Sequence, residues 1–411
     1  MAVPIGGIKS VRAIIHIGTE KTGTTALQET LYNNADSLYE CGILYLSGEG
    51  LVNARDLVAA CLVEDVHDDY LVAAGIDKAD ERSAFQRIML DAYTARLQEA
   101  RDECHTLIIS SEHLHSRLTR IEEIERLKAL LSPYVTNFSV VCYLRRQVDM
   151  VGSVYSTVLK GGGTPNFRGY MHDMLSDNKY YCDYRRLLKN WASVFGRGAI
   201  KARMYARSRL RRGNIIDDFF HLESLSEAGL RRRAGSVNES VNHLGQVLLR
   251  ELNRGVKPAR TDHEEVNLKI VRQTISQAFA GKGEQLPAEE AAAYQAGFDE
   301  INESVRHDYF PQESELFSKN FADDDGRMLT SEQEKAIKCL VAVEATDGPG
   351  TGSLCDYNEY ADVLRDASDL LVGRDHDKAY HLMKFAHLIR PRGELIKQKL
   401  ANLESERCSG L

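Results

Sequence analysis

The sequence lacks the features that mark membrane-spanning and nucleic-acid-binding proteins. No apolar run among its 411 residues is long enough to span a bilayer. The N-terminal apolar segment is too short for a signal peptide. We therefore expect a cytoplasmic protein with no integral membrane segment. The formal net charge of -8 disfavours a general affinity for nucleic acid, so any anion site must be a local basic pocket.

Metal-binding patterns are also missing from the sequence. The eight cysteines lie singly along the chain, and no Cys-x-x-Cys pair occurs. This spacing argues against a zinc site or a redox dithiol, and reduced thiols are the expected state. Apart from His113 and His115, the histidines show no His-x-His or His-x-x-x-His spacing. We therefore predict no metal site.

Short apolar runs separated by helical stretches predict an α/β protein with a central parallel sheet. Three runs are apolar throughout, as in strands covered on both faces, and a fourth is more polar and more edge-like. These four runs are 12–18, 106–112, 138–145 and 199–205. Helices are expected at 81–103, 120–134 and 240–253. In such sheets, ligands bind beyond the carboxyl ends of the strands.

The alternation of strands and helices stops after residue 205, and the turn-rich stretch 346–353 is typical of a linker. We predict an α/β domain with helical insertions over 1–345, then a linker and a helical extension over 346–411. Ala379, Ala386 and Pro391 give the extension one tetratricopeptide-like unit, fewer than the roughly three that such arrays need. A helical cap on the main domain is the favoured interpretation. A partner contact, such as a homodimer through these helices, is the alternative.

Near the N-terminus, "IIHIGTEKTGTTALQETL" has the pattern of a strand, a glycine turn and a helix start. Gly18 and Gly23 have the spacing of a phosphate-binding loop, and a helix N-terminus presents unpaired N–H groups to an anion. The Lys-Ser/Thr pair that nucleotide triphosphatases place after the second glycine is absent. Lys21 lies inside the turn instead, and Thr24 and Thr25 follow the glycine. This pattern favours an anion held without a tightly bound metal.

The stretch "TEKTGTT" resembles the 5′-phosphosulfate loop of sulfotransferases that use 3′-phosphoadenosine 5′-phosphosulfate (PAPS). The resemblance implies a three-layer, P-loop-like fold with PAPS as the sulfuryl donor. It implies that Lys21 contacts the sulfuryl group and the bridging oxygen. It also implies that Thr22, Gly23, Thr24 and Thr25 cradle the phosphate. The resemblance covers roughly residues 11–253, and it is specific at motif level only at the two nucleotide sites.

The family's second motif is an Arg at a strand end with a Ser eight residues later, which together bind the 3′-phosphate. In "YLRRQVDMVGSVYS", Arg145 and Ser153 have this spacing, and Asp149 lies between them. Arginine suits phosphate because its planar fork is permanently charged and bidentate. Arg146 is the competing candidate, one residue later. In "IKARMYARSRL", Tyr205 resembles an aromatic residue near the adenine, and a half-buried core tyrosine is an equally good interpretation.

Transfer to a hydroxyl gains typically ~10²–10⁴-fold from a base that takes the proton. In the family this base is a His or Glu just beyond the second strand of this type, and here that stretch is "LIISSEHLHS". Glu112 is the preferred base because it directly follows the strand. His113 and His115 remain alternatives. A helix cap or a salt-bridge partner is the structural role that competes for Glu112.

The resemblance predicts sulfuryl transfer from PAPS to a hydroxyl acceptor, and a carbohydrate or glycoconjugate is the preferred class. The glycine-rich, aromatic stretch 160–181 is the best candidate for the acceptor pocket. Two arginine-rich stretches, 209–214 and 230–235, could close over the nucleotide or form a solvated face. Two other functions stay open: a P-loop ATP-dependent small-molecule kinase, which needs Mg²⁺, and a catalytically silent nucleotide-binding scaffold.

Overall fold

The computed structural model describes two compact units, each built from separated parts of the chain. The first unit holds Met1–Met150, Leu175–Asn238 and Tyr294–Lys319, and the second holds Val151–Met174, Glu239–Ala293 and Asn320–Leu411. The described residues are 11–76, 78–177, 179–227, 229–231, 240–255, 262–321, 365–366, 368–369, 372, 376–389 and 393–408. The predicted linker at 346–353 and the boundary at 345 lie outside them.

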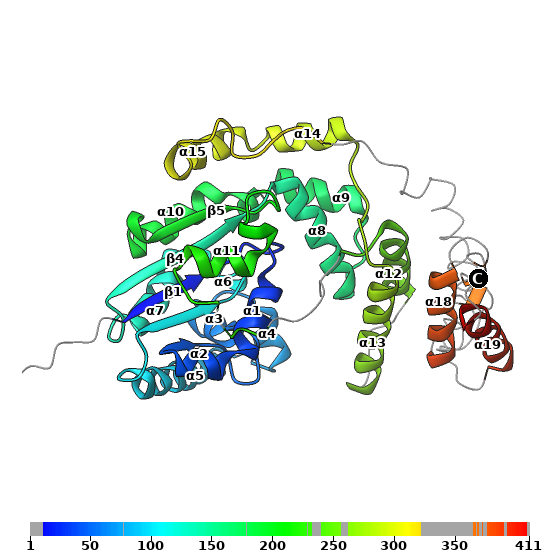
Figure 1. Ribbon diagram of the computed structural model, residues 1–411, viewed down its shortest axis with the longest axis horizontal. Coiled ribbons are helices and arrows are strands. Elements are labelled where there is room, and N and C mark those ends of the chain that lie inside the picture. The colour runs from blue at the N-terminus through cyan, green and yellow to red at the C-terminus, as the bar shows by residue number, and fades with distance from the viewer. Residues whose placement is uncertain are drawn as a thin grey trace, which may run out of the picture. The chain divides into compact units, whose positions relative to one another are not determined.

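A five-stranded, all-parallel sheet forms the centre of the first unit (Figure 1). Its strands are β1 Arg12–His16, β2 Ile43–Tyr45, β3 Thr106–Ser110, β4 Asn137–Leu144 and β5 Ile200–Met204. Their order is β2-β3-β1-β4-β5. The predicted α/β class with a central parallel sheet is confirmed, and the more polar run at 199–205 is indeed an edge strand. At three residues, β2 is too short for a pattern of apolar residues to reveal it.

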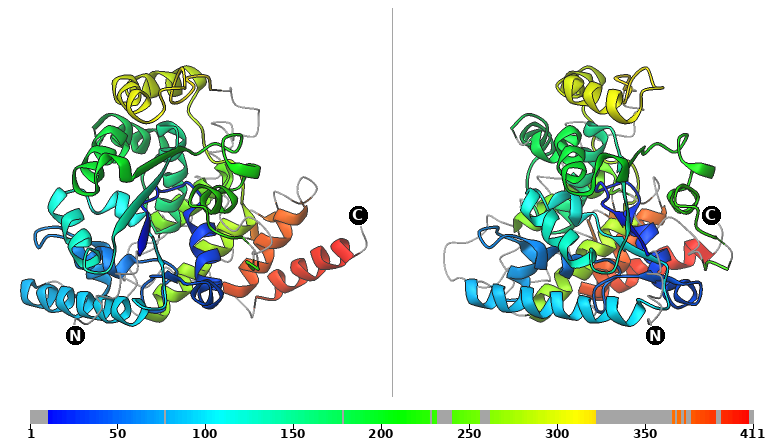
Figure 2. Two further views of the ribbon diagram at one scale, coloured as in Figure 1. Left: turned by 60° about the vertical axis from the view of Figure 1, so that its left-hand side comes forward. Right: turned by 90° about the vertical axis from the view of Figure 1, so that its left-hand side faces the viewer.

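Helices cover both faces of this sheet (Figure 2). On one face, α1 (Thr24–Asn33) and α11 (Ile215–Leu222) share an apolar core with the strands. On the other face, Phe138 of β4 meets Phe195 of α10 (Tyr184–Phe195), with ring centroids 5.0 Å apart. Since successive strand residues point to opposite faces, Phe138 lies opposite the core residue Val141.

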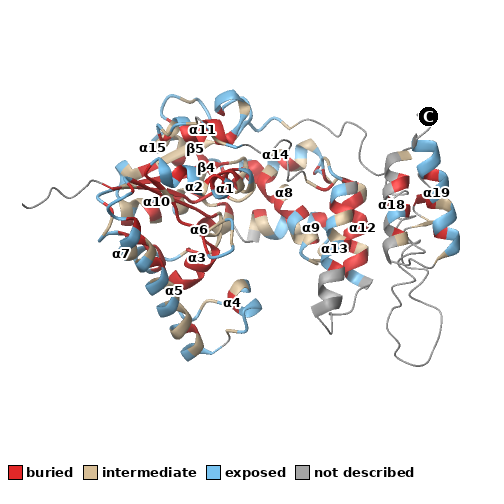
Figure 3. Cartoon of the chain, turned by 60° about the horizontal axis from the view of Figure 1, so that its bottom comes forward, coloured by how far each residue is buried: buried red, intermediate tan, exposed pale blue. Residues whose placement is uncertain are grey.

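The remaining helices surround this core or lie at its ends. They are α2 Ala35–Glu40, α3 Arg55–Cys61, α4 Asp69–Ala73, α5 Ala79–Ala100, α6 His113–Ser116, α7 Ile121–Leu131 and α15 Asp299–Tyr309, with short turns at Lys179–Cys182, Arg197–Ala199 and Arg211–Gly213. The predicted helices at 81–103 and 120–134 correspond to α5 and α7. Buried residues gather on the strands and on the inner sides of the helices (Figure 3).

The second unit is helical where it is described. Its helices are α9 Phe167–His172, α12 His243–Gly255, α13 Asp262–Ala278, α18 His376–Ile389 and α19 Glu394–Cys408, while α8 Gln147–Lys160 and α14 Ala288–Ala296 each belong partly to both units, with a π-helical turn at Asp173–Asp177. The predicted helix at 240–253 is α12. In the predicted extension, α18 packs against α19, and Ala379 and Ala386 are buried, while Pro391 lies outside the described residues.

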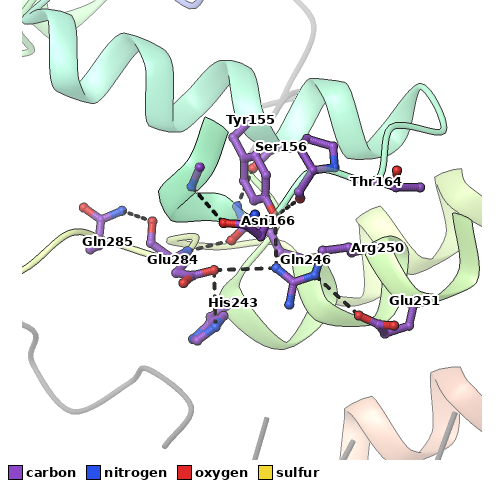
Figure 4. A network of polar contacts seen from close by, with 12 residues as sticks. Tyr155, Ser156, Thr164, Asn166, His243, Gln246, Arg250, Glu251, Glu284 and Gln285 are labelled. Carbon is purple, nitrogen blue, oxygen red and sulfur yellow. Dashed lines mark hydrogen bonds and ion pairs between the residues drawn. The ribbon is translucent and has the colours of Figure 1, made fainter. Parts of the chain in front are cut away.

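A polar network fixes α12 within the second unit (Figure 4). The Arg250 side chain is almost wholly buried, donates to the Tyr155 hydroxyl at 3.1 Å and lies 4.0 Å from the Glu284 carboxylate. His243 Nε2 lies 3.6 Å from the same carboxylate. The side-chain oxygen of Gln246 accepts from the Glu284 backbone N–H at 2.7 Å. Within the second unit, the Glu284 carboxylate therefore lies near two basic side chains, Arg250 and His243.

Candidate functional site

The loop predicted to bind an anion leaves the carboxyl end of the central strand. β1 is flanked by β3 and β4, so the ends of three neighbouring strands meet at this edge of the sheet. The chain reaches β2, two positions away on one side, by way of α1, and it crosses from β3 to β4 over β1. An edge where the connections diverge in this way is where parallel sheets bind ligands.

Hydrogen bonds to β4 and within the turn hold the loop in shape. Thr19 donates through both its hydroxyl and its N–H to the Tyr143 carbonyl, at 3.0 and 2.9 Å. The Thr22 hydroxyl donates to the Thr19 carbonyl at 2.6 Å. Lys21 and Gly23 both have left-handed backbones, with φ of 62° and 80°. Thr19 and Thr22 therefore serve the loop's own architecture and are wholly buried.

The loop ends at the N-terminus of α1, which begins with Thr24 and Thr25. Gly23 occupies the cap position, and no described side chain caps the helix there. The first N–H groups of α1 are therefore available to an anion. A Cβ atom at Gly23 would lie 3.0 Å from Ile215 and 3.2 Å from the Tyr205 hydroxyl oxygen, so only glycine fits. The structure thus brings the Tyr205 hydroxyl to the helix N-terminus, and a place beside an adenine stays a prediction.

The two arginines after β4 have different roles. Arg145 donates to the Lys21 carbonyl at 2.9 Å and so contacts the loop directly. Burial raises the pKa of Tyr205. The positive charge of Arg145 opposes this shift, which means that the guanidinium lies near the Tyr205 ring. Arg146 instead makes two bonds to the Asp149 carboxylate, at 2.8 and 3.0 Å. Arg145 is therefore the arginine that contacts the loop, whereas Arg146 forms an ion pair with Asp149.

Ser153 lies on α8 and is half-buried. Arg145 belongs to the first unit, whereas Ser153 lies on the part of α8 that belongs to the second. The guanidinium of Arg145 donates to the loop, and its backbone carbonyl accepts from the Tyr184 hydroxyl at 2.6 Å. A joint role of Arg145 and Ser153 at a 3′-phosphate therefore stays a prediction.

Glu112 follows β3 and lies beside the start of the loop, next to Gly18. Its Oε2 accepts a hydrogen bond from Gln28 of α1 at 2.7 Å. A Cβ atom at Gly18 would lie 3.3 Å from the Glu112 Cα, so the two backbones are in close contact. Glu112 immediately precedes α6, yet its side chain makes no capping bond to the described residues of that helix. The carboxylate is thus oriented by α1 and is not used as a helix cap.

The two rival histidines lie on α6, just after Glu112. Burial lowers the pKa of both His113 and His115, so both imidazoles are neutral at pH 7. His115 Nε2 lies 3.0 Å from the Tyr181 carbonyl oxygen. Because a carbonyl can only accept, this nitrogen carries the proton, and Nδ1 of His115 is an acceptor.

Sequence reasoning missed Glu20, the acid inside the loop. Burial by itself would raise its pKa, but the polar groups of His115, Ser116 and Tyr181 beside it outweigh this effect and lower the pKa. The carboxylate is therefore ionised at neutral pH, and it faces α6. The signal was present in "TEKTGTT", since an acid between the two glycines of an anion-binding loop must have partners elsewhere in the fold.

The structure describes the predicted arginine-rich stretches and acceptor segment only in part. In the first arginine-rich stretch, Arg209 makes two hydrogen bonds of 2.8 Å to Glu313, and Arg212 lies 3.5 Å from Glu227. Most of the second stretch lies outside the described residues. Residues 160–174 of the predicted acceptor segment belong to the second unit, and the end of that segment lies in the first.

Two features are missing from the part of the chain that the structure describes. Among the described residues, no group of three or more His, Cys, Asp or Glu side chains could hold a metal ion. Within the same ranges, no helix combines the length and the apolar character needed to cross a membrane.

Comparison with known proteins assigns no family to the chain. No family model matches the chain. The chain is 28% identical over 212 residues to an uncharacterised protein of Archaeoglobus fulgidus, an alignment that covers 50% of this chain and 54% of that protein. The chain thus spans about half the length of this relative, and the relative's name states no activity.

Proposed function

We propose that this protein is a sulfotransferase that moves a sulfuryl group from PAPS to a hydroxyl acceptor, preferably a carbohydrate. The observation that carries the proposal is the set of groups around the glycine loop. Lys21 lies within the turn, Arg145 is bonded to its carbonyl, and Tyr205 reaches the uncapped start of α1. These groups fit an anionic nucleotide. The strand order, with the loop after the central strand, supports a P-loop-like fold.

Each residue of the site would have its own role in binding or transfer. The first-turn N–H groups of α1, with Thr24 and Thr25, would hold the 5′-phosphate. Lys21 would stabilise the charge on the sulfuryl group as it moves. Arg145, together with Ser153, would hold the 3′-phosphate, and Tyr205 would lie beside the adenine. Thr22 and Gly23 would contribute through the loop backbone, because the Thr22 hydroxyl is already bonded within the turn.

The reaction we propose is an in-line displacement. The acceptor oxygen forms a bond to sulfur while the bond from sulfur to the bridging phosphate oxygen breaks, and the hydroxyl proton passes to a base. Glu112 is the base we propose, because Gln28 orients its carboxylate at the mouth of the loop. His113 and His115 remain alternatives, since both are neutral at pH 7 and able to accept a proton. We further propose that α18 and α19 are a helical cap, with a homodimer contact as the alternative.

Calorimetric titration with adenosine 3′,5′-bisphosphate and with ATP, each with and without Mg²⁺, tests the donor site. We expect tight binding of the bisphosphate that does not depend on Mg²⁺, and weak binding of ATP. Mg²⁺-dependent binding of ATP in preference to the bisphosphate would overturn the proposal and favour a kinase. Bisphosphate binding without sulfuryl transfer to any of a panel of hydroxyl acceptors would favour a silent scaffold.

A further inference from the structure

A small pocket lies beside Glu20, within the first unit. Its walls include His115 and Ser116 of α6, Tyr180 and Tyr181 of the turn Lys179–Cys182, and Asn190 and Trp191 of α10. The cavity has a volume of about 20 Å³. A space of this size takes one water-sized polar group, provided that the walls offer it hydrogen-bond partners.

Trp191 gives the pocket an unused donor. Its side chain is 0% exposed, and its Nε1 has no hydrogen-bond partner among the described residues. The indole ring stacks on Phe195, with ring centroids 5.6 Å apart and an interplanar angle of 11°, which fixes its direction. A buried N–H without an acceptor is unfavourable, so its presence in the wall of a cavity points to a group that supplies one.

His115 gives the pocket the complementary acceptor. Its Nε2 carries the proton that faces the Tyr181 carbonyl, so Nδ1 has a lone pair. This Nδ1 is buried, and no described residue hydrogen-bonds to it. A group that satisfies both walls must accept from Trp191 and donate to His115. A hydroxyl does both, whereas a carboxylate or phosphate oxygen can only accept and an ammonium can only donate.

The pocket is linked to the loop through Glu20. The Glu20 carboxylate lies close to Ser116 and Tyr181, both in the pocket wall, and these side chains help to lower its pKa. Glu20 directly precedes Lys21 in the chain, so the pocket adjoins the residue proposed to handle the sulfuryl group. The ionised Glu20 also disfavours an anionic group at this place, because like charges repel most strongly where water is scarce.

We propose that this pocket binds one hydroxyl group of the acceptor, and that the acceptor is a neutral polyol with a second hydroxyl near the one that is sulfated. This inference rests on the proposed function, because it takes Lys21 as the place of transfer. The pocket then selects the acceptor by hydrogen bonding, and Glu20 selects against acidic sugars.

The single tryptophan of the chain makes a test possible without an activity assay, because the intrinsic tryptophan fluorescence comes from this pocket alone. The full-length protein, saturated with adenosine 3′,5′-bisphosphate, is titrated with methyl glucoside, with methyl glucuronide and with cyclohexanol. We expect a saturable change in emission with the neutral glucoside, and at least tenfold weaker responses with the acidic sugar and the single alcohol. Equal responses to all three, or none, would overturn the inference; solvent water alone would then occupy the pocket.

A pair of variants separates hydrogen bonding from packing. Trp191→Phe keeps an aromatic ring on Phe195 but removes the N–H, and we expect the acceptor KM to rise about three- to tenfold with kcat nearly unchanged. Phe195→Leu disturbs the same stack and keeps the N–H, so its acceptor KM should stay near that of the native protein. An equal rise in both variants would mean that packing alone is at work.

The two proposals fail in different ways. If the bisphosphate does not bind in calorimetry, the proposed function fails. If the bisphosphate binds and sulfuryl transfer occurs, but Trp191 does not respond to neutral polyols, only the pocket inference fails.

Discussion

Two polar clusters, one in each unit, differ in the partners of their charged groups. Around Arg250 in the second unit, the charges meet opposite charges and a tyrosine hydroxyl (Figure 4). Around Glu20 in the first unit, an ionised acid is flanked by neutral histidines. There, the described residues leave the Trp191 N–H and a His115 nitrogen without partners. Polar groups satisfied inside the protein fix a structure, whereas those left open are available to a ligand.

The largest effect on stability should come from breaking the cluster around Arg250. Arg250→Ala leaves the Glu284 carboxylate buried without this cation, and we expect a loss of about 3–5 kcal/mol in the free energy of unfolding, measured with urea. Arg254→Ala is the matched control on the same helix, since its exposed side chain pairs with Glu251 at 2.8 Å and such pairs contribute only about 0.3–0.5 kcal/mol. Similar losses in both variants would mean that the network around Arg250 is not the stabilising element.

In the cluster around Glu20 and its neighbour Lys21, the largest effect should be on catalysis and not on stability. Lys21→Ala should lower the rate of sulfuryl transfer by about 10²–10³-fold, because it removes a cation from the transferring group. Calorimetry should find bisphosphate binding largely kept, since Arg145 remains. Lys189→Ala, at an exposed position of α10, should leave the rate unchanged. Native activity in the Lys21 variant would remove this lysine from the mechanism.

A smaller effect, on nucleotide binding, should distinguish the adjacent residues Arg145 and Arg146. Arg145→Ala should weaken binding of adenosine 3′,5′-bisphosphate by about 10–100-fold, the effect expected for a hydrogen bond to a charged group. Arg146→Ala should change binding little, because Arg146 is engaged with Asp149. AMP, which has only the 5′-phosphate, should lose much less affinity in the Arg145 variant. An equal loss for AMP would show that Arg145 supports the loop through the Lys21 carbonyl and does not read the 3′-phosphate.

The effect that is smallest at neutral pH concerns His16, in β1 just ahead of the loop. Its Nδ1 lies 2.8 Å from the Ser110 hydroxyl oxygen, and burial lowers its pKa to about 3. Between pH 6.5 and 3 the unfolded chain therefore binds a proton that the folded protein does not. The free energy of unfolding should fall with decreasing pH, by up to ~1.4 kcal/mol per pH unit from this group.

Urea unfolding at a series of pH values checks this dependence. His16→Gln can keep a hydrogen bond to Ser110 but does not titrate, so its stability should depend less steeply on pH below 6.5. Parallel pH profiles for the native protein and the variant would show that His16 does not contribute to acid sensitivity.

The sequence predicted what short local patterns determine. The apolar runs gave four of the five strands, and the glycine spacing gave the loop at the end of β1. Arg145 was placed correctly at a strand end because it directly follows the last apolar residue of its run. The division into two units was out of reach, since each unit joins segments far apart in the chain, and α8 belongs partly to both.

The sequence did not predict the cluster around Glu20, for a related reason. A motif is recognised by the residues that match it, and Glu20 matches none of the groups that cradle phosphate. The side chains that lie near its carboxylate, Ser116 and Tyr181, come from segments nearly a hundred or more residues later in the chain. Likewise, no pattern shows that the indole of Trp191 lines a cavity, because that depends on how α10 packs against α6.

The loop carries one acidic and one basic side chain, Glu20 and Lys21, next to each other. Their charges cancel, so attraction for a phosphorylated nucleotide must come from the helix N-terminus and Arg145 and not from a surplus of positive charge. In the proposed reaction, the spent nucleotide keeps two phosphates and must depart in every cycle. A loop that is neutral overall holds such a product less firmly than a wholly basic one, which favours turnover over retention.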